Sequence, residues 1–274
     1  LRAIDDRAGG TETRRGRVDL IGAGPGDPEL LTFKAARAIA RADVVLYDAL
    51  VDPRVVALAR RDAELLDVGK RAGGRSTPQV EICALVAEHA AAGKRVVRIK
   101  GGDPSVFGRA AEELAAARAV GATVEIIPGV TAASAAAAAI GAPLTARGAA
   151  ASVTLAAGRG ADGGAMRDVV DDDAVVAVYM AGRDLAAHAA LLIAHGRRAD
   201  TPCAVIENAS RPDEAKRFFT LGALAETGPI ALSGAAVLLL IGDVVALSPE
   251  WVDRPSEVLK AQATVDGCRF APAG

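Results

Sequence analysis

Short runs of β-branched and other apolar residues alternate, along the first half of the chain, with stretches whose apolar positions recur at helical spacing. The apolar runs predict strands at residues 18–21, 44–47, 64–68, 95–99 and 123–127. The intervening stretches predict helices at residues 32–42, 53–59, 78–92 and 110–119. Strands that alternate with helices are typical of a parallel sheet, because the helices provide the crossover connections.

The second half of the chain predicts a further α/β unit. It begins with an alanine-rich helix at residues 131–140, where alanine costs no side-chain entropy. The remaining elements are strands at 153–156, 175–179, 203–207, 217–220 and 237–241, and helices at 185–195 and 221–227. We therefore expect two α/β domains between two tails, namely a disordered tail at 1–16, an N-terminal domain at 17–129, a C-terminal domain at 130–250 and a tail at 251–274.

Composition narrows the possible functions. The 274 residues are 51% hydrophobic but only 3% aromatic, so the core must consist of Ala, Val, Leu and Ile. A net charge of -2 leaves no basic surplus for nucleic acid or an anionic membrane. No run approaches the roughly 20 apolar residues of a membrane span, and residues 1–16 lack the apolar region of a signal peptide. Cys83, Cys203 and Cys268 are too far apart for a CxxC-type metal site, which favours a reduced, cytoplasmic protein without a metal.

A glycine-rich corner follows the predicted strand at 95–99, in the segment 100–109 (KGGDPSVFGR). Gly101 and Gly102 allow positive φ and let another molecule approach the backbone. Asp103 is held extended because it precedes a proline. Open α/β sheets bind ligands at the carboxyl ends of their strands, so this corner is a candidate ligand site. A plain strand-to-helix turn with an exposed aspartate is the alternative for these residues.

Other predicted strands also end in glycine-rich loops or charged residues, namely 22–27 (GAGPGD), Asp48, Lys70 and the Pro-Gly pair at 128–129. In a parallel sheet these ends share one edge, so together they indicate a binding site. The first loop suggests a nucleotide or adenosyl ligand but lacks the GxGxxG spacing of dinucleotide-binding folds. Because Asp48 lies roughly where a ribose-binding carboxylate would be, a Rossmann-type NAD-dependent dehydrogenase stays an alternative.

Several motifs occur in order, namely GAGPGD at 22–27, YD at 47–48, VGKRAG at 68–73, KGGDPxxFGR at 100–109, PGVTA at 128–132, PLTxRG at 143–148, YM at 179–180 and ENAS at 207–210. Together, over about residues 18–247, they resemble the tetrapyrrole methylase family, in particular its uroporphyrinogen-III C-methyltransferases and the methylase module of siroheme synthase. The resemblance implies transfer of two methyl groups from S-adenosylmethionine to C2 and C7 of uroporphyrinogen III. The products would be S-adenosylhomocysteine and precorrin-2, which leads to siroheme or cobalamin. It also implies a homodimer of two α/β domains, with the active site in the cleft between the domains.

The resemblance further implies roles for individual residues. Asp48 matches the family's proposed proton acceptor and Lys70 its proposed proton donor, although a strand-end turn residue and a surface charge fit them equally well. A positioned base accelerates a reaction by about 10²–10⁴-fold. The residues expected at the S-adenosylmethionine site are Pro25, Gly101, Gly102, Asp103, Val106, Thr131, Ala132, Met180 and Ala209. On its own, Thr131 would fit a helix N-cap, and Met180 would fit core packing.

A polycarboxylate substrate requires local positive charge on this slightly acidic protein. Arginine forks bind carboxylates bidentately, so the candidates are Arg71, Arg75, Arg109 and Arg147. Four residues depart from the family pattern, namely Ala49, Ser105, Ala146 and Arg159, which replace the usual Arg, Phe, His and His. The alanines remove polar contacts and should affect substrate binding more than donor binding. Another precorrin methylase, a relative that acts on RNA or diphthine, and a non-catalytic adenosyl-binding protein remain alternatives.

Overall fold

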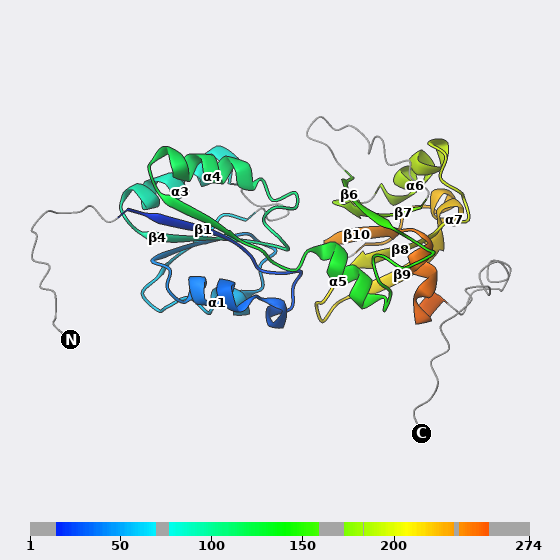
Figure 1. Ribbon diagram of the computed structural model, residues 1–274, viewed down its shortest axis with the longest axis horizontal. Helices are drawn as coiled ribbons and strands as arrows, with labels where there is room; N and C mark the ends of the chain where they lie inside the picture. The colour runs from blue at the N-terminus through cyan, green and yellow to red at the C-terminus, as the bar shows by residue number, and fades with distance from the viewer. Residues whose placement is uncertain (1–14, 70–76, 159–172, 183, 233–235, 252–274) are drawn as a thin grey trace, which may run out of the picture. The chain divides into compact units, whose positions relative to one another are not determined.

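The computed structural model describes residues 15–69, 77–158, 173–182, 184–232 and 236–251 (Figure 1). Contacts between Cα atoms divide the chain into two compact units, one that ends at Thr131 and one that begins at Ala132. Each unit contains its own five-stranded sheet. The chain therefore passes from the first unit to the second directly before an alanine-rich helix.

The sheet of the first unit is entirely parallel, as the alternation of strands and helices predicted. Its strand order is β3-β2-β4-β1-β5, so β1 and β4 lie side by side near the centre. The strands are β1 (Arg17–Gly22), β2 (Val44–Tyr47), β3 (Glu64–Asp67), β4 (Arg95–Lys100) and β5 (Thr123–Ile127). Each lies within one residue of its predicted range. Because all five run in one direction, their carboxyl ends meet at one edge.

Helices cover both faces of this first sheet. On one face, α1 (Phe33–Ile39) and α2 (Pro53–Val56) pack against a cluster that includes Ile21 and Val45. On the other face, α3 (Gln79–Ala91) and α4 (Ala110–Ala119) pack against the opposite side chains of the same strands (Figure 1). This alternation buries the sheet on both sides, which is the arrangement expected for a parallel sheet.

Two of these helices begin where side chains satisfy their first backbone N–H groups, and both end earlier than predicted. Thr32 caps α1 by accepting a bond from the N–H of Ala35, and Asp52 caps α2 by accepting one from Arg54. After Ala40 and after Ala57 the backbone changes to bonds between residues three apart, which tighten the last turn. These turns carry the chain to the residues at which the helices were predicted to end. A short 3-10 helix, η1 (Pro28–Leu30), precedes α1.

The sheet of the second unit is mixed, with the order β6-β7-β10-β8-β9. Its strands are β6 (Ser152–Ala157), β7 (Ala174–Tyr179), β8 (Pro202–Glu207), β9 (Ala215–Thr220) and β10 (Val237–Ile241). Strand β6 is parallel to β7, whereas β10 is antiparallel to both β7 and β8. Strands β7 and β8 therefore point the same way, and their carboxyl ends lie at the same edge, beside the start of β10.

Each face of the second sheet carries its own apolar core. One core contains buried alanines of α5 (Ala132–Ala139) and residues of η2 (Asp243–Leu247) and η3 (Pro249–Trp251). The other contains residues of α6 (Leu185–Ala194) and α7 (Leu221–Glu226). In the first core, the rings of Phe218 and Trp251 meet edge to face with centroids 6.2 Å apart. Aliphatic and alanine side chains supply most of the remaining packing, as the scarcity of aromatic residues required.

Candidate functional site

The loops after β1 and β4 are joined through their backbones at the carboxyl edge of the first sheet. The N–H of Gly102 donates to the carbonyl of Gly24 at 2.7 Å, and the N–H of Gly24 donates to the carbonyl of Gly102 at 3.2 Å. The N–H of Ala23 also donates to the carbonyl of Lys100 at 2.8 Å. The two glycine-rich corners singled out by the sequence thus form one continuous backbone surface.

The loop after β5 joins the same surface at a point where only glycine fits. A Cβ atom added to Gly22 would lie 2.4 Å from the carbonyl oxygen of Gly102 and 2.7 Å from the Cα of Gly129. A Cβ added to Gly129 would lie 2.4 Å from the same oxygen. Real Cβ atoms do not come this close to backbone, so all three loops depend on missing side chains. The three loops therefore converge, as the clustering of strand ends predicted.

Asp103 fixes the geometry of this convergence. Its Oδ1 atom accepts a bond from the N–H of Ser105 at 2.7 Å, and its Oδ2 atom accepts one from the N–H of Gly129 at 3.0 Å. One carboxylate therefore shapes its own loop and ties that loop to the loop after β5. Gly101 remains exposed, with a bare backbone that a ligand can approach.

The rest of the Gly-Gly-Asp loop adopts backbone conformations that side chains rarely take. Phe107 and Arg109 have φ angles of 52° and 53°, in the left-handed region. Such residues cost on the order of 1–3 kcal/mol each and persist only where the surroundings hold them. Strained residues of this kind cluster at ligand-binding sites, which agrees with a binding role for this loop.

Asp48, at the end of β2, is ion-paired with Arg98 of β4. The side chain of Asp48 is 30% exposed, whereas that of Arg98 is 2% exposed. Arg98 also donates to the carbonyl of Ile99 at 2.7 Å, so its guanidinium is fixed from more than one side. Asp48 is therefore a half-buried carboxylate held by a buried cation, and it lies at the same sheet edge as the three loops. Whether it accepts a proton stays a prediction.

A buried charge cluster continues beneath this edge. The Oε1 atom of Glu113, on α4, accepts hydrogen bonds from Lys100 Nζ at 2.8 Å and from Arg98 Nε at 3.3 Å. The Glu113 side chain is fully buried and that of Lys100 is nearly so. Burial and the neighbouring Arg98 charge lower the pKa of Lys100, and Glu113 partly offsets this effect.

Sequence reasoning missed Arg98, Lys100 and Glu113. A signal was present, because β4 carries three cations, Arg95, Arg98 and Lys100, in a strand whose residues are all buried except the first. Charged residues are almost never fully buried unless they are paired. Glu113 also lies at helical spacing from the buried Ala110 and Ala117, which places it on the inner face of α4.

The second unit gathers three predicted donor-site residues at one edge of its sheet. Met180 directly follows β7, and Ala209 lies two residues beyond β8 at the same edge. The Tyr179 hydroxyl accepts a bond from the N–H of Ala133 at 3.0 Å, which holds the start of α5, and with it Ala132, beside the end of β7. Met180 is 50% exposed, so core packing does not explain it. Donor binding by these three residues stays a prediction.

The loop after β8 is itself built with left-handed residues. Asn208 and Ser210 have φ angles of 52° and 67°. The Asn208 amide donates to Asp213 at 2.7 Å, and the N–H of Ser210 donates to Glu214 at 2.8 Å. These bonds stabilise a strained loop at the edge where Met180 lies, and Met180 has a φ of 54°.

Of the four predicted substrate arginines, the structure describes Arg109 in the first unit and Arg147 in the second. Arg109 forms a bidentate, exposed ion pair with Glu112, at 2.8 and 2.7 Å. Arg147 is exposed on the loop after α5 and forms no ion pair with any residue that the structure describes. Lys70, Arg71, Arg75 and Arg159 lie outside the described residues. Their contacts with substrate stay predictions.

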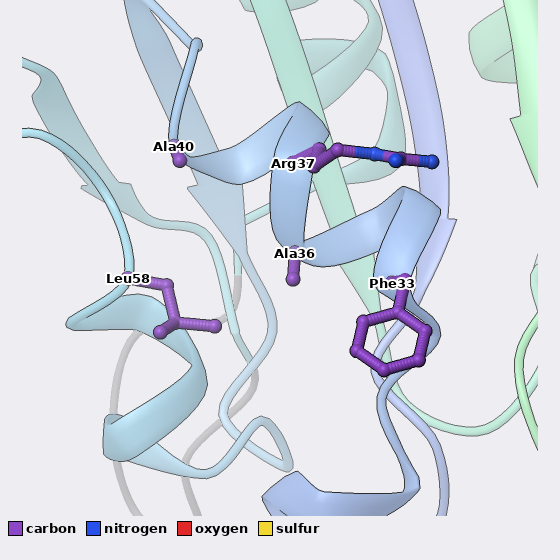
Figure 2. Close-up of a pocket in the computed structure, with 5 residues that line it drawn as sticks. All are labelled: Phe33, Ala36, Arg37, Ala40 and Leu58. Atoms are coloured by element: carbon purple, nitrogen blue, oxygen red, sulfur yellow. The ribbon is translucent and has the colours of Figure 1, made fainter.

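A further surface hollow lies away from this edge, along α1 and the segment after α2 (Figure 2). Phe33, Ala36, Ala40 and Leu58 line it, and Arg37 extends away from Leu58. Its lining holds no nucleophile and no acid or base that titrates near neutral pH, so it does not carry the chemistry. Within the described ranges, no group of three or more His, Cys, Asp or Glu residues could hold a metal ion. None of the described helices has the length and apolar character needed to cross a membrane.

Residues 17–225 match the family model of the Tetrapyrrole (Corrin/Porphyrin) Methylases, a range that holds the whole first sheet and strands β6 to β9 of the second. The chain belongs to the tetrapyrrole methylase family. It is 46% identical over 247 residues to siroheme synthase of Tolumonas auensis. This alignment covers 89% of the chain but 51% of the relative, so the chain spans about half the length of that protein.

Two further proteins are similar to most of the chain. The chloroplastic S-adenosyl-L-methionine-dependent uroporphyrinogen III methyltransferase of Arabidopsis thaliana is 45% identical over 241 residues, which are 86% of this chain and 65% of that protein. A crystal structure of uroporphyrin-III C-methyl transferase from Thermus thermophilus, complexed with S-adenyl homocysteine, matches with a TM-score of 0.72 at 40% identity. That match covers 85% of this chain and 94% of the Thermus chain, so the α/β fold with its parallel sheet is that of a tetrapyrrole methylase.

Proposed function

We propose that this tetrapyrrole methylase transfers two methyl groups from S-adenosylmethionine to C2 and C7 of uroporphyrinogen III, giving precorrin-2 for siroheme or cobalamin biosynthesis. The observation that carries the proposal is the convergence of the loops at Gly22, Gly102 and Gly129, which the Gly24–Gly102 backbone bonds and Asp103 hold together. This bare backbone surface suits an adenosyl ligand. The chain's similarity to a methyltransferase structure that holds S-adenyl homocysteine supports the same ligand class.

The donor site in this proposal has residues from both units. Pro25, Gly101, Gly102, Asp103, Val106 and Thr131 come from the first unit, and Ala132, Met180 and Ala209 come from the second. The bound donor would lie in a cleft between two domains, residues 17–129 and 130–250. The proposal also includes that the protein is a homodimer and is located in the cytoplasm.

The reaction that this site would catalyse needs alignment more than acid strength. A pyrrole carbon attacks the methyl group of the sulfonium, the carbon–sulfur bond breaks, and its electron pair stays on the sulfur of S-adenosylhomocysteine. Holding the two reactants in line can remove roughly 7–11 kcal/mol of the barrier. The rigid backbone of the three joined loops is suited to that positioning.

The methylated macrocycle must then lose a proton, and Asp48 is the proposed acceptor, with Lys70 the proposed donor. Asp48 is half-exposed, so a substrate can reach it, and its ion pair with Arg98 fixes its orientation. Leu50 and Phe107 are 55% and 44% exposed on the adjoining loops. Apolar side chains in such positions would pack against the pyrrole rings of the macrocycle. Arg71, Arg75, Arg109 and Arg147 remain the proposed partners of its carboxylates.

The experiment for this proposal combines the purified protein with S-adenosylmethionine and uroporphyrinogen III under reducing, anaerobic conditions. Mass spectrometry should find a product heavier by two methyl groups, with S-adenosylhomocysteine formed in proportion. A parallel titration with NAD should show no binding. Donor binding without a methylated product would contradict uroporphyrinogen III as the substrate. A protein that binds NAD but not S-adenosylmethionine would contradict methyl transfer as the reaction.

A further inference from the structure

A fully buried carboxylate lies beneath the proposed site without touching it. Glu113 is in the first turns of α4, and its side chain has 0% exposure. Its Oε1 atom accepts three hydrogen bonds, from Lys100 Nζ at 2.8 Å, Gln79 Nε2 at 3.1 Å and Arg98 Nε at 3.3 Å. The donors come from α3 and β4, so one oxygen atom connects both helices on this face to the central strand.

The two cations that Glu113 holds lead to different parts of the proposed site. Arg98 pairs with Asp48, the proposed proton acceptor at the end of β2. Lys100 is the residue directly before Gly101, and its Cε atom would lie 3.2 Å from a Cβ placed on Gly108. The Lys100 side chain therefore passes under the Gly-Gly-Asp loop. Glu113 is the group shared by the base and the donor loop.

The charges in this cluster balance. Arg98 and Lys100 are two cations, and Asp48 and Glu113 are two anions. A buried ion pair contributes little net stability compared with apolar residues of the same volume, but removal of one partner alone is strongly destabilising. Stability therefore does not by itself explain the cluster, whereas fixing two functional segments relative to one another does.

We propose that Glu113 is a positioning residue, which holds Arg98 against Asp48 and Lys100 beneath the donor loop, and so aligns the proposed base with the proposed methyl donor. This inference rests on the proposed function. It adds a residue of α4 that contacts neither reactant. It also assigns one group to both halves of the reaction, because loss of Glu113 removes a hydrogen-bond partner from both cations at once.

The test compares wild type with Glu113→Gln in two measurements at a temperature where circular dichroism shows both to be fully folded. We expect S-adenosylhomocysteine to bind about 10-fold more weakly to the variant by calorimetry, because the donor loop loses its support. We expect kcat to fall about 100-fold at saturating donor, a loss that weaker binding alone cannot produce. Glu113→Asp, which keeps the charge, should recover part of both losses.

A second variant keeps the test decisive if Glu113→Gln does not fold. Lys100→Met/Glu113→Gln removes one cation and one anion, so the remaining Arg98–Asp48 pair stays balanced and the protein should fold. We expect this double variant to keep both losses, because Arg98 still lacks its bond to Glu113 and the donor loop still lacks the Lys100–Glu113 pair beneath it. Recovery of wild-type kcat in the double variant would show that Glu113 only neutralises Lys100, and would overturn the inference.

Glu64→Gln is the matched control. Glu64 also pairs with a lysine, Lys94, at 3.1 Å, but it lies at the amino edge of the sheet, away from the loops. The donor affinity and kcat of the Glu64→Gln variant should equal those of wild type. If wild type itself neither binds the donor nor methylates, the proposed function fails and the inference falls with it. If wild type does both and every Glu113 variant matches it, the inference alone fails.

Discussion

The Oδ2 atom of Asp103 accepts a hydrogen bond from the backbone N–H of Gly129 at 3.0 Å, so a single carboxylate joins the loop after β4 to the loop after β5. A hydrogen bond to a charged group contributes about 1.5–3 kcal/mol. Asp103→Ala should therefore weaken S-adenosylhomocysteine binding by about 10- to 100-fold, measured by calorimetry.

Asp43→Ala is the control for this change. Its Oδ2 atom accepts a bond from the N–H of Arg95 at 2.8 Å, which joins two segments at the opposite, amino edge of the same sheet. We expect this variant to lose a comparable amount of stability while its donor affinity stays that of wild type. Equal donor affinity in Asp103→Ala and wild type would show that the loop connection does not shape the donor site.

Gly22 lies where the three loops are closest. Gly22→Ala would place a Cβ 2.4 Å from the carbonyl oxygen of Gly102, so the backbone of at least one loop must move. Overpacking of this kind costs typically about 1–3 kcal/mol of stability. We predict this loss in urea denaturation, together with loss of measurable S-adenosylhomocysteine binding. Gly228→Ala, which meets no atom within 4 Å, should change neither, and donor binding retained in Gly22→Ala would count against the site.

The lowered pKa of Lys100 predicts that the stability of the protein depends on pH. Burial and Arg98 lower its pKa in the folded protein, so between that value and its unfolded pKa of about 10.4 the unfolded chain binds more protons. The charged, buried Lys100 therefore destabilises the fold most below its folded pKa, and this destabilisation decreases as pH rises through the window. The free energy of unfolding of wild type, minus that of Lys100→Met, should rise toward pH 10 in urea titrations. A difference that stays flat or falls with pH would contradict this assignment.

The sequence was sufficient for the features that depend on neighbours along the chain. The β-branched runs located the strands of the first sheet, and the glycines at 22, 102 and 129 marked the edge where its loops meet. These glycines could be found because a parallel sheet places every strand's carboxyl end on one side. The helix ends were less accurate, since the last turns of α1 and α2 change to bonds between residues three apart.

Features that depend on which elements become neighbours could not be derived from local pattern. The contact of Glu113 with Lys100 exists only because α4 packs beside β4, which brings together two residues separated by a loop. The link from Asp103 to Gly129 requires β1 to lie between β4 and β5. Likewise, nothing in the apolar run at Val237–Ile241 indicated that β10 would run antiparallel between β7 and β8.

Asp48→Asn tests most directly whether this sheet edge carries out a methyl transfer with Asp48 as the base. The substitution keeps the size of the side chain and removes its capacity to accept a proton, and Asp48 takes no part in the bonds that join the glycine loops. Wild type and variant should be purified in parallel. Each preparation should then be titrated with S-adenosylhomocysteine and assayed for methylation of uroporphyrinogen III. We predict equal donor affinity, with turnover lower by about 10²–10⁴-fold in the variant. Wild-type turnover in Asp48→Asn would contradict the account, because the macrocycle's proton would then leave by another route.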